Sequence, residues 1–282
     1  MKRFWTIVFS LLVWAAIVFY IVWSSDMSSR RRNEVVIESL AVKVADSALT
    51  HLVSPEMVEG WIELDGLNPV GLRVGEVDAR RITRAVRDRG SVAEASTYMD
   101  LEGTVYVSVT QRKPAFRVIT ERGYDFFVTD DGYILPREGY PTQYIPVVTG
   151  NFGLPFDKGF AGGLTEYAEE EEKKSDKNYI FLCKLINFVK YIGENEFWRS
   201  QIVQINVTGQ NNGPGSGNYL YHEPEVEFIP RVGDHTVVLG RLDGYEEKLG
   251  NLMLFYQQAI PVEGWGKWSV ISLKYDNQIV CK

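Results

Sequence analysis

The side chains that most often perform catalysis or bind metal ions are few in this chain and stand far apart. The three histidines are His51, His222 and His235, and the two cysteines are Cys183 and Cys281. No pair of histidines has the H-x-x-x-H spacing that places two metal ligands on one helix face, and no cysteine pair accompanies a histidine. Two cysteines do not make a disulfide framework, so we expect two separate thiols, with a disulfide in an oxidising compartment as the alternative. The sequence therefore predicts neither a metal site nor a cofactor site.

Motifs for nucleophilic catalysis or phosphate binding are also missing from the sequence. It contains no G-x-S-x-G, S-x-x-K, P-loop or G-x-G-x-x-G pattern. Asp130 and Asp131 form a carboxylate pair suited to acid–base chemistry, but Asp131-Gly132 is also the signal of a tight hairpin turn, which explains the pair better. We therefore predict a protein that is not an enzyme. A membrane-anchored hydrolase that uses Asp130, Asp131 or His235 is the alternative from that class.

Charge restricts the partners that this chain can bind. After Trp23 it holds 28 Lys and Arg, because Lys2 and Arg3 precede that residue, against 37 Asp and Glu, which gives a formal charge of −9. Such a charge argues against general nucleic-acid binding, which needs a basic surface. The predicted helix over 77–89 carries a local exception, an arginine row that is either a solvated face or a surface for an acidic partner or lipid. The row consists of Arg80, Arg81, Arg84 and Arg87.

A long apolar stretch near the start of the chain has the properties of a membrane anchor. Residues 4–23 carry no charge, and only Thr6 and Ser10 among them are clearly polar. As a helix that rises about 1.5 Å per residue, the stretch spans roughly 30 Å, the thickness of the hydrocarbon core of a bilayer. It is longer than a signal-peptide core and ends without an A-x-A pattern, so we expect an uncleaved anchor. We assign residues 1–24 to a cytoplasmic stub and a transmembrane helix, and residues 25–33 to a linker.

The charges that flank this stretch leave the orientation of the anchor nearly open. Lys2, Arg3 and the terminal amine precede it, and Arg30, Arg31 and Arg32 follow it. The count that the positive-inside rule compares is therefore almost equal on the two sides. Because Lys2 and Arg3 abut the apolar stretch, the pattern mildly favours a cytoplasmic N-terminus, with the rest of the chain outside the cytoplasm.

Two folded domains are expected after the linker, and together they predict the α+β class. Residues 34–119 have the order strand, helix, helix, strand, strand, and residues 120–282 form a β-rich domain with two helices. The first domain is predicted to contain strands over 34–45, 92–99 and 104–119 and helices over 54–61 and 77–89. The second is predicted to contain a hairpin over 126–135, helices over 176–193 and 245–258, and strands over 202–207, 226–229, 236–239 and 267–280.

The last predicted strand, residues 267–280, is a candidate site for a protein partner. Ile271, Leu273 and Tyr275 alternate with polar residues and therefore share one face. A strand at the end of a sheet pairs on one side only, so its other edge offers unpaired N–H and C=O groups to which a partner segment can add. We hypothesise that this strand is such an edge, with the three side chains near the contact. The alternative is that they simply face the core.

The order of these elements resembles that of a known family. A strand–helix–helix–strand–strand block directly after a single anchor resembles a POTRA domain. The stretch Gly103–Ala115, GTVYVSVTQRKPA, is similar to the end of the POTRA domain in the FtsQ/DivIB bacterial cell-division proteins, where alternating apolar residues lead into a Glu/Gln-Arg-x-Pro step. Val128–Gly132, followed by Leu135, is similar to the opening of the second, β-rich domain of that family. Further similar stretches are Val238-Leu239-Gly240, Glu247-Lys248-Leu249 with Leu252, and Ile271–Tyr275 with Asn277–Val280.

The resemblance implies a non-enzymatic scaffold of the divisome that needs no cofactor. Such a protein crosses the bacterial inner membrane once, with its N-terminus in the cytoplasm and its C-terminal domains in the periplasm. Its POTRA domain helps to place it at the septum, and its β-domain binds FtsB and FtsL, a complex that regulates the septal peptidoglycan synthases. Many members carry a longer cytoplasmic tail than Met1–Arg3. The region where the family binds FtsB corresponds here to Ile271, Leu273, Lys274, Tyr275, Gln278 and Ile279.

Two further readings of the POTRA-like block are kept beside this one. A POTRA-bearing chaperone or translocation component for envelope proteins is the alternative function, although such proteins commonly carry repeated POTRA units and this sequence shows one. Within the scaffold reading, the arginine row Arg80, Arg81, Arg84 and Arg87 is a possible second partner surface.

Overall fold

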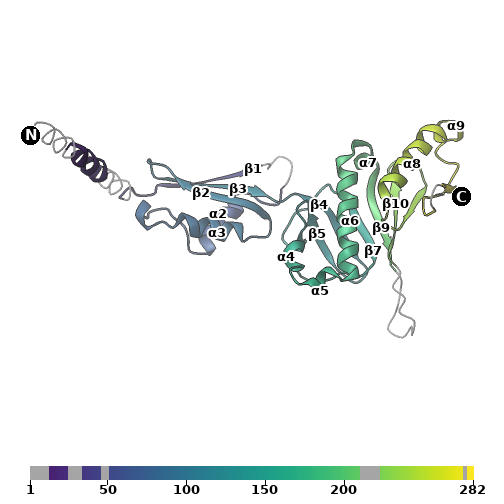
Figure 1. The fold of residues 1–282 in the computed structure, drawn as a ribbon, viewed down its shortest axis with the longest axis horizontal. Helices are drawn as coiled ribbons and strands as arrows, with labels where there is room; N and C mark the ends of the chain where they lie inside the picture. The colour runs from purple at the N-terminus through teal and green to yellow at the C-terminus, as the bar shows by residue number, and fades with distance from the viewer. Residues whose placement is uncertain (1–12, 25–33, 46–50, 210–222, 276–277) are drawn as a thin grey trace, which may run out of the picture. The chain divides into compact units, whose positions relative to one another are not determined.

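The computed structural model describes residues 13–24, 34–45, 51–209, 223–275 and 278–282 (Figure 1). Residues 13–24 are helical, whereas residues 4–12 of the expected anchor and the linker over 25–33 lie outside the described residues. None of the helices found among the described residues combines the length and the hydropathy that crossing a bilayer requires. Contacts between Cα atoms divide the chain into two units, Met1–Gln111 and Arg112–Lys282, and each is described by itself below.

The first unit has the predicted order of strand, helix, helix, strand, strand. Its three-stranded sheet has the order β1-β3-β2, in which β1 runs parallel and β2 antiparallel to the central strand. α2 packs against β1, and α3 packs against β2. The elements are β1 (Ser39–Ala45), α2 (Pro55–Leu64), the 3₁₀ turn η1 (Val74–Glu76), α3 (Ala79–Arg87), β2 (Val92–Met99) and β3 (Thr104–Gln111).

Short-range sequence signals set the ends of the two helices in this unit. The Ser54 hydroxyl accepts a hydrogen bond from the Met57 N–H, 3.3 Å away, and thereby caps α2. The Asp78 carboxylate accepts bonds from the N–H groups of Arg80 and Arg81 at 3.1 and 3.0 Å and caps α3. Such caps satisfy backbone donors that have no partner within the helix, which explains why both helices begin where the sequence predicts.

The second unit is built on a ten-stranded sheet with the order β13-β12-β11-β10-β9-β7-β4-β5-β6-β8. Its strands are β4 (Pro114–Thr120), β5 (Asp125–Thr129), β6 (Tyr133–Pro136), β7 (Val147–Asn151), β8 (Gly162–Gly163), β9 (Ile202–Thr208), β10 (Glu225–Pro230), β11 (Thr236–Gly240), β12 (Val270–Ser272) and β13 (Val280–Cys281). Its helices are α4 (Leu164–Tyr167), α5 (Glu171–Lys174), α6 (Lys177–Glu194), α7 (Glu196–Gln201), α8 (Tyr245–Gln258) and α9 (Ile260–Glu263). The β-rich character and the two long helices, α6 and α8, are confirmed.

The strand predicted over 104–119 is in fact two strands that belong to different sheets. β3 ends at Gln111, and β4 begins at Pro114 and pairs with β5 and β7 in the sheet of the second unit. Pro114 has no N–H to donate to a ladder, so continuous pairing is interrupted there. The division of the chain therefore lies after Gln111, earlier than the boundary between 119 and 120 that the sequence suggested.

One hydrophobic core holds the second unit together. Figure 1 shows α6 lying across the sheet over β4, β5 and β7. Leu185 and Phe188 of α6 are fully buried in a core that also includes Ile205 of β9. α8 covers the same core farther along the sheet, and the rings of Phe188 and Tyr245 meet edge to face with centroids 5.3 Å apart. The core therefore runs without a break under both helices and reaches the last strands of the chain.

Candidate partner-binding surface

The end of the chain forms a small hairpin instead of the single strand predicted over 267–280. β12 pairs in parallel with β11, and β13 returns antiparallel to β12. The Leu273 N–H still donates to the Val238 carbonyl at 2.8 Å, but β11 ends at Gly240. The register between β11 and β12 ends at Val238 and Ser272, and Gly240, with a φ of 76° in the left-handed region, departs from extended strand geometry. The chain beyond Lys274 therefore loses its partner and reverses.

This hairpin moves the edge of the sheet from the predicted residues to β13. In the described residues β13 is the last strand at its end of the ten-stranded sheet. Ile271 is fully buried, with β11 on one side and Cys281 of β13 opposite it on the other. Its side chain therefore belongs to the core, as the alternative reading of the alternation expected. The edge with which a partner strand can pair is therefore β13, Val280–Cys281.

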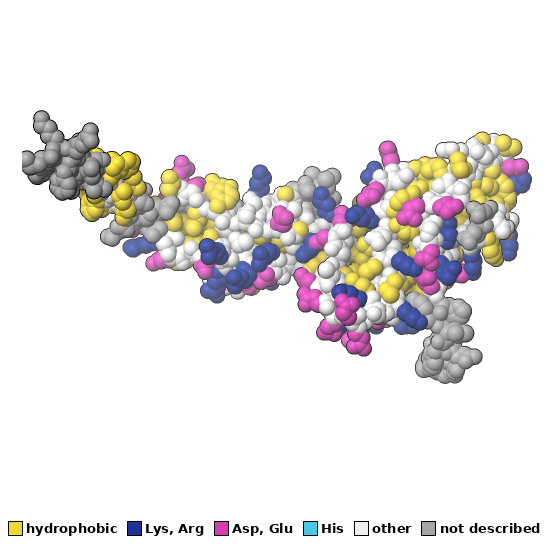
Figure 2. Space-filling view, in the orientation of Figure 1, with side chains coloured by type: hydrophobic (Ala, Val, Ile, Leu, Met, Phe, Trp, Pro, Cys, Tyr) yellow, Lys and Arg dark blue, Asp and Glu magenta, His cyan; other side chains and the backbone are white. Residues whose placement is uncertain are grey.

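A groove runs between α8 and the segment that joins the two hairpin strands. Its volume is about 590 Å³. From residue 247 to residue 258 of α8 it extends over about three helical turns, or roughly 16 Å at 1.5 Å per residue. Its lining residues are Asp243, Gly244, Glu247, Lys248, Asn251, Leu254, Phe255, Gln258, Leu273, Tyr275, Gln278 and Ile279. Figure 2 shows hydrophobic side chains at the surface in this part of the molecule, around α8 and α9.

Four of the six residues predicted at the end of the chain line this groove. Leu273 is 3% exposed and lies with the core, whereas Tyr275 is 55% exposed. Gln278 is exposed, and Ile279 is half-buried against the core. The accessible groups on this wall are therefore an aromatic ring, an amide and an aliphatic side chain, which suits contact with a partner of mixed polarity.

Lys274, the fifth of these residues, lies beside the groove and forms an ion pair. Its Nζ is 2.5 Å from Glu225 Oε1 of β10, and the hydrogen bond to that carboxylate raises the pKa of Lys274. Both side chains also line a smaller hollow of about 310 Å³ that shares Tyr275 with the groove. The groove therefore continues into a charged region.

The opposite wall, on α8, is the part of this surface that the sequence did not reveal. Leu254 is 52% exposed although it is aliphatic, and Phe255 packs on the Trp268 ring with centroids 5.2 Å apart. At the other end, Lys248 Nζ donates to the Leu239 and Arg241 carbonyls at 3.2 and 2.8 Å. The sequence held one signal for this wall. Leu254 is an apolar residue on the side of an amphipathic helix that faces away from the core.

A lysine-centred ion pair fixes the polar end of the groove. Lys184 of α6 reaches Asp243 Oδ1 at 2.8 Å and Glu223 Oε1 at 2.7 Å. The hydrogen bond from Lys184 lowers the pKa of Asp243, and the two carboxylates raise the pKa of Lys184. These charges link α6 to Asp243, two residues before the first residue of α8, so the start of the groove is held to the body of the unit.

The arginine row on α3 is divided by the structure into two parts. Arg80, Arg84 and Arg87 line one hollow of about 270 Å³ together with Ala79, Thr83 and Thr97. Arg81 is exposed but is not among the residues that line the hollow. Figure 2 shows Lys and Arg side chains gathered over the part of the first unit where Figure 1 places α3.

The residues proposed for a hydrolase are not brought together. Asp130 and Asp131 follow β5, whereas His235 precedes β11, five positions away in the sheet order. At about 4.8 Å per strand that separation is roughly 24 Å. His235 is 1% exposed, and its Nε2 lies 2.7 Å from the Tyr256 hydroxyl, so it is a buried structural group.

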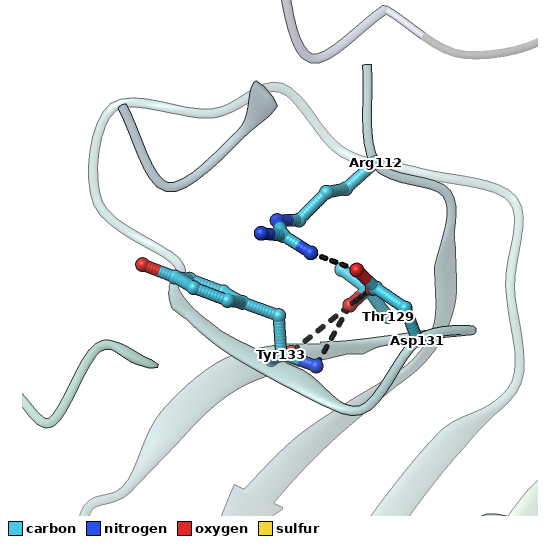
Figure 3. Close-up of polar contacts among 4 residues, drawn as sticks. All are labelled: Arg112, Thr129, Asp131 and Tyr133. Carbon is cyan, nitrogen blue, oxygen red and sulfur yellow. Dashed lines mark hydrogen bonds and ion pairs between the residues drawn. The ribbon is translucent and has the colours of Figure 1, made fainter. Parts of the chain in front are cut away.

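The carboxylate of Asp131 is occupied by a turn-stabilising cluster (Figure 3). Arg112 forms an ion pair with Asp131 and stacks over the Tyr133 ring, 4.1 Å from its centroid. The Thr129 hydroxyl lies 2.5 Å from Asp131 Oδ1 and also accepts a bond from the Tyr133 N–H at 3.0 Å. The hairpin reading of this Asp-Gly turn thus accounts for Asp131, one of the two carboxylates that acid–base chemistry would have needed.

The described part of the chain holds neither a cluster of metal-binding side chains nor a pair of cysteines in contact. Groups of three or more His, Cys, Asp or Glu that could hold a metal ion are absent from those residues. Cys183 and Cys281 are both free and half-buried, and burial raises the pKa of each thiol. The two thiols are therefore separate, as the sequence favoured.

Comparison with known families gives two matches, which together span nearly all residues after the linker. The family described as FtsQ/DivIB, C-terminal related, matches residues 113–282, and a POTRA-like domain matches residues 35–110. The two matches meet where the contacts divide the chain, after Gln111. A search of curated proteins finds no matching relative.

Proposed function

Because this chain belongs to the FtsQ/DivIB family of cell-division proteins, we propose that it is a non-enzymatic scaffold of the division complex. The apolar residues 4–23 anchor it in the bacterial inner membrane, with its N-terminus in the cytoplasm and both folded units in the periplasm at the septum. The second unit binds single-pass partners of the FtsB and FtsL type, and this complex acts indirectly on the septal peptidoglycan synthases.

The observation that carries this proposal is an open sheet edge beside an open groove. A partner strand that adds to Val280–Cys281 gains main-chain hydrogen bonds, which are insensitive to sequence. A side chain or helix of the same partner that enters the groove meets Leu254, Tyr275 and Ile279, which supply the specificity. The two features lie on one surface because Ile279 directly precedes β13.

The test compares partner affinity across three variants of the full chain in nonionic detergent, with a purified FtsB/FtsL-type pair as the probe. Leu254→Glu places a charge in the apolar part of the groove and should weaken binding by at least about tenfold. Cys281→Pro removes the N–H that faces the free edge, because Lys282, the next residue, exchanges its backbone hydrogen bonds with Val270 of β12; this variant should also weaken binding. Ile180→Glu is the matched control, because Ile180 is a 43% exposed aliphatic residue on α6 outside the groove.

Each outcome of this test has a definite meaning. Loss of affinity in the first two variants with an unchanged control supports the edge and the groove as one site. Equal affinity in all three folded variants would mean that the partner does not bind at this surface. Failure of the unaltered chain to bind any such pair would contradict the proposed partners. Resistance of the full chain to alkaline extraction from membranes tests the anchor separately.

A further inference from the structure

The first unit carries a cluster of exposed arginines on one face of α3. Arg80, Arg84 and Arg87 stand at positions i, i+4 and i+7 of α3, so their side chains point to one face of the helix. All three are exposed and line the 270 Å³ hollow. Within the described residues, no carboxylate forms an ion pair with any of them.

Ion pairs within the described residues do not neutralise these three arginines, although the protein as a whole is acidic. After Trp23 the chain has a formal charge of −9, so acidic side chains are abundant enough to neutralise exposed arginines. Elsewhere in the same unit Arg89 pairs with Asp65 at 2.8 Å, and Arg117 of the second unit pairs with Asp125 at 2.6 Å. The three guanidinium groups of the hollow therefore concentrate positive charge on an otherwise acidic protein.

The hollow also contains neutral hydrogen-bonding groups between the arginines. The Thr83 hydroxyl of α3 donates to the Thr97 hydroxyl of β2 at 2.9 Å, and both residues are half-buried. Guanidinium groups bind phosphate oxygens through paired N–H donors, and hydroxyl groups add single bonds to the same oxygens. A compact hollow of this volume matches a headgroup better than an extended acidic peptide, which needs a longer track.

We propose that Arg80, Arg84 and Arg87 form a site for the phosphate headgroup of an anionic phospholipid in the membrane that anchors the chain. The inference rests on the anchor of the proposed function. Residues 24–33 join the apolar stretch to the first unit, and a chain of that length reaches at most about 35 Å. The first unit is thus confined near the bilayer surface, where each arginine gains affinity from anionic lipid.

The experiment measures hydrogen exchange over residues 79–97 in the full chain, kept in nonionic detergent and titrated with dihexanoyl phosphatidylglycerol. The lipid should slow exchange in α3 at concentrations at least about tenfold lower than dihexanoyl phosphatidylcholine, which has the same tails and no net charge. Raising salt from about 50 mM to about 300 mM should weaken the effect, because exposed charges are screened. This assay requires neither membrane insertion nor a division partner.

Two triple variants separate the site from general charge. Arg80→Gln/Arg84→Gln/Arg87→Gln should abolish the protection, and glutamine preserves helix propensity. Arg81→Gln/Arg122→Gln/Arg231→Gln removes the same charge from exposed arginines outside the hollow and should leave the protection intact. Circular dichroism and unchanged hydrogen exchange over β3, the central strand of the same unit, show that the first variant is folded.

Several results overturn the proposal. If the two lipids slow exchange in α3 equally, or if the anionic lipid slows it equally in the two triple variants, there is no headgroup site at these arginines. Saturation by inorganic phosphate at the same concentration as the lipid makes it a site for free phosphate. Protection by a Glu-rich peptide at lower concentration than the lipid makes it a protein-docking surface. Failure of the partner assay alone contradicts the groove on the second unit and leaves the lipid result standing.

Discussion

α6 and α8 cover the same sheet and touch through Phe188 and Tyr245, but they differ in how many side chains they bury and in what lies beside their exposed faces. α6 buries six side chains and α8 buries three, so α6 contributes more to the core. Each also exposes one aliphatic side chain, Ile180 on α6 and Leu254 on α8. Only Leu254 faces a second wall, the segment that carries Tyr275. An exposed aliphatic residue thus indicates a docking site when the fold places a groove beside it.

The largest effect should come from the core of α6. Phe188→Ala removes a fully buried ring that packs on Tyr245, so the free energy of unfolding of the second unit should fall by about 3–5 kcal/mol. Urea denaturation followed by circular dichroism measures the loss. Ile180→Ala, on the exposed face of the same helix, should change it by less than about 0.5 kcal/mol. A loss below about 1 kcal/mol for Phe188→Ala would contradict the role given to α6.

A smaller loss is expected on the buried side of α8. Tyr256→Phe removes the hydroxyl that lies 2.7 Å from His235 Nε2 and leaves that nitrogen without its partner in a buried site. The free energy of unfolding should fall by about 1–3 kcal/mol, the usual cost of an unsatisfied buried polar group. The same denaturation assay measures it. An unchanged value would mean that water replaces the hydroxyl.

The His235–Tyr256 pair also makes the α8 side sensitive to acid. Burial lowers the pKa of His235 below its ordinary value near 6.5, and nearby Asp234 only partly opposes this. Because the unfolded chain binds the proton more readily, the free energy of unfolding should fall as pH drops below about 6.5, by at most about 1.4 kcal/mol per pH unit. His235→Gln should flatten this slope. Asp243 loses its stabilising charge only at lower pH, since its pKa is lowered, so the two effects are separable.

The sequence predicted the parts of this fold that depend on local signals. Ser54 and Asp78 marked helix starts, and the alternation around Val107 marked a buried strand. It did not predict the end of the chain, because the length of the β12 ladder depends on its partner β11, a strand that lies about thirty residues earlier in the chain. Apolar and polar residues keep alternating in 267–280 beyond the point where β12 is still paired with β11. The alternation therefore could not show that the chain reverses into β13.

The candidate site shows the same division between local and distant causes. Tyr275 was predicted from the alternation of residues 267–280, and Gln278 and Ile279 from the resemblance to the family; the structure places all three on one groove wall. Leu254 and Phe255 form the other wall, but in the sequence they only belonged to an amphipathic helix. What makes them part of a surface is the position of a segment about twenty residues farther along the chain, which periodicity does not encode.

A substitution at Leu254 should have the smallest effect on the free energy of unfolding but a clear effect on the affinity for the partner. Leu254→Ala trims a side chain that is 52% exposed, so the free energy of unfolding should change by less than about 0.5 kcal/mol. Affinity for the FtsB/FtsL-type pair should nevertheless fall by about tenfold, because the side chain is buried only when the groove is filled. Ile180→Ala, equally harmless to folding, should leave the affinity unchanged. If both alanine variants bind alike, the difference between α6 and α8 concerns the core alone, and the groove is not where the partner binds.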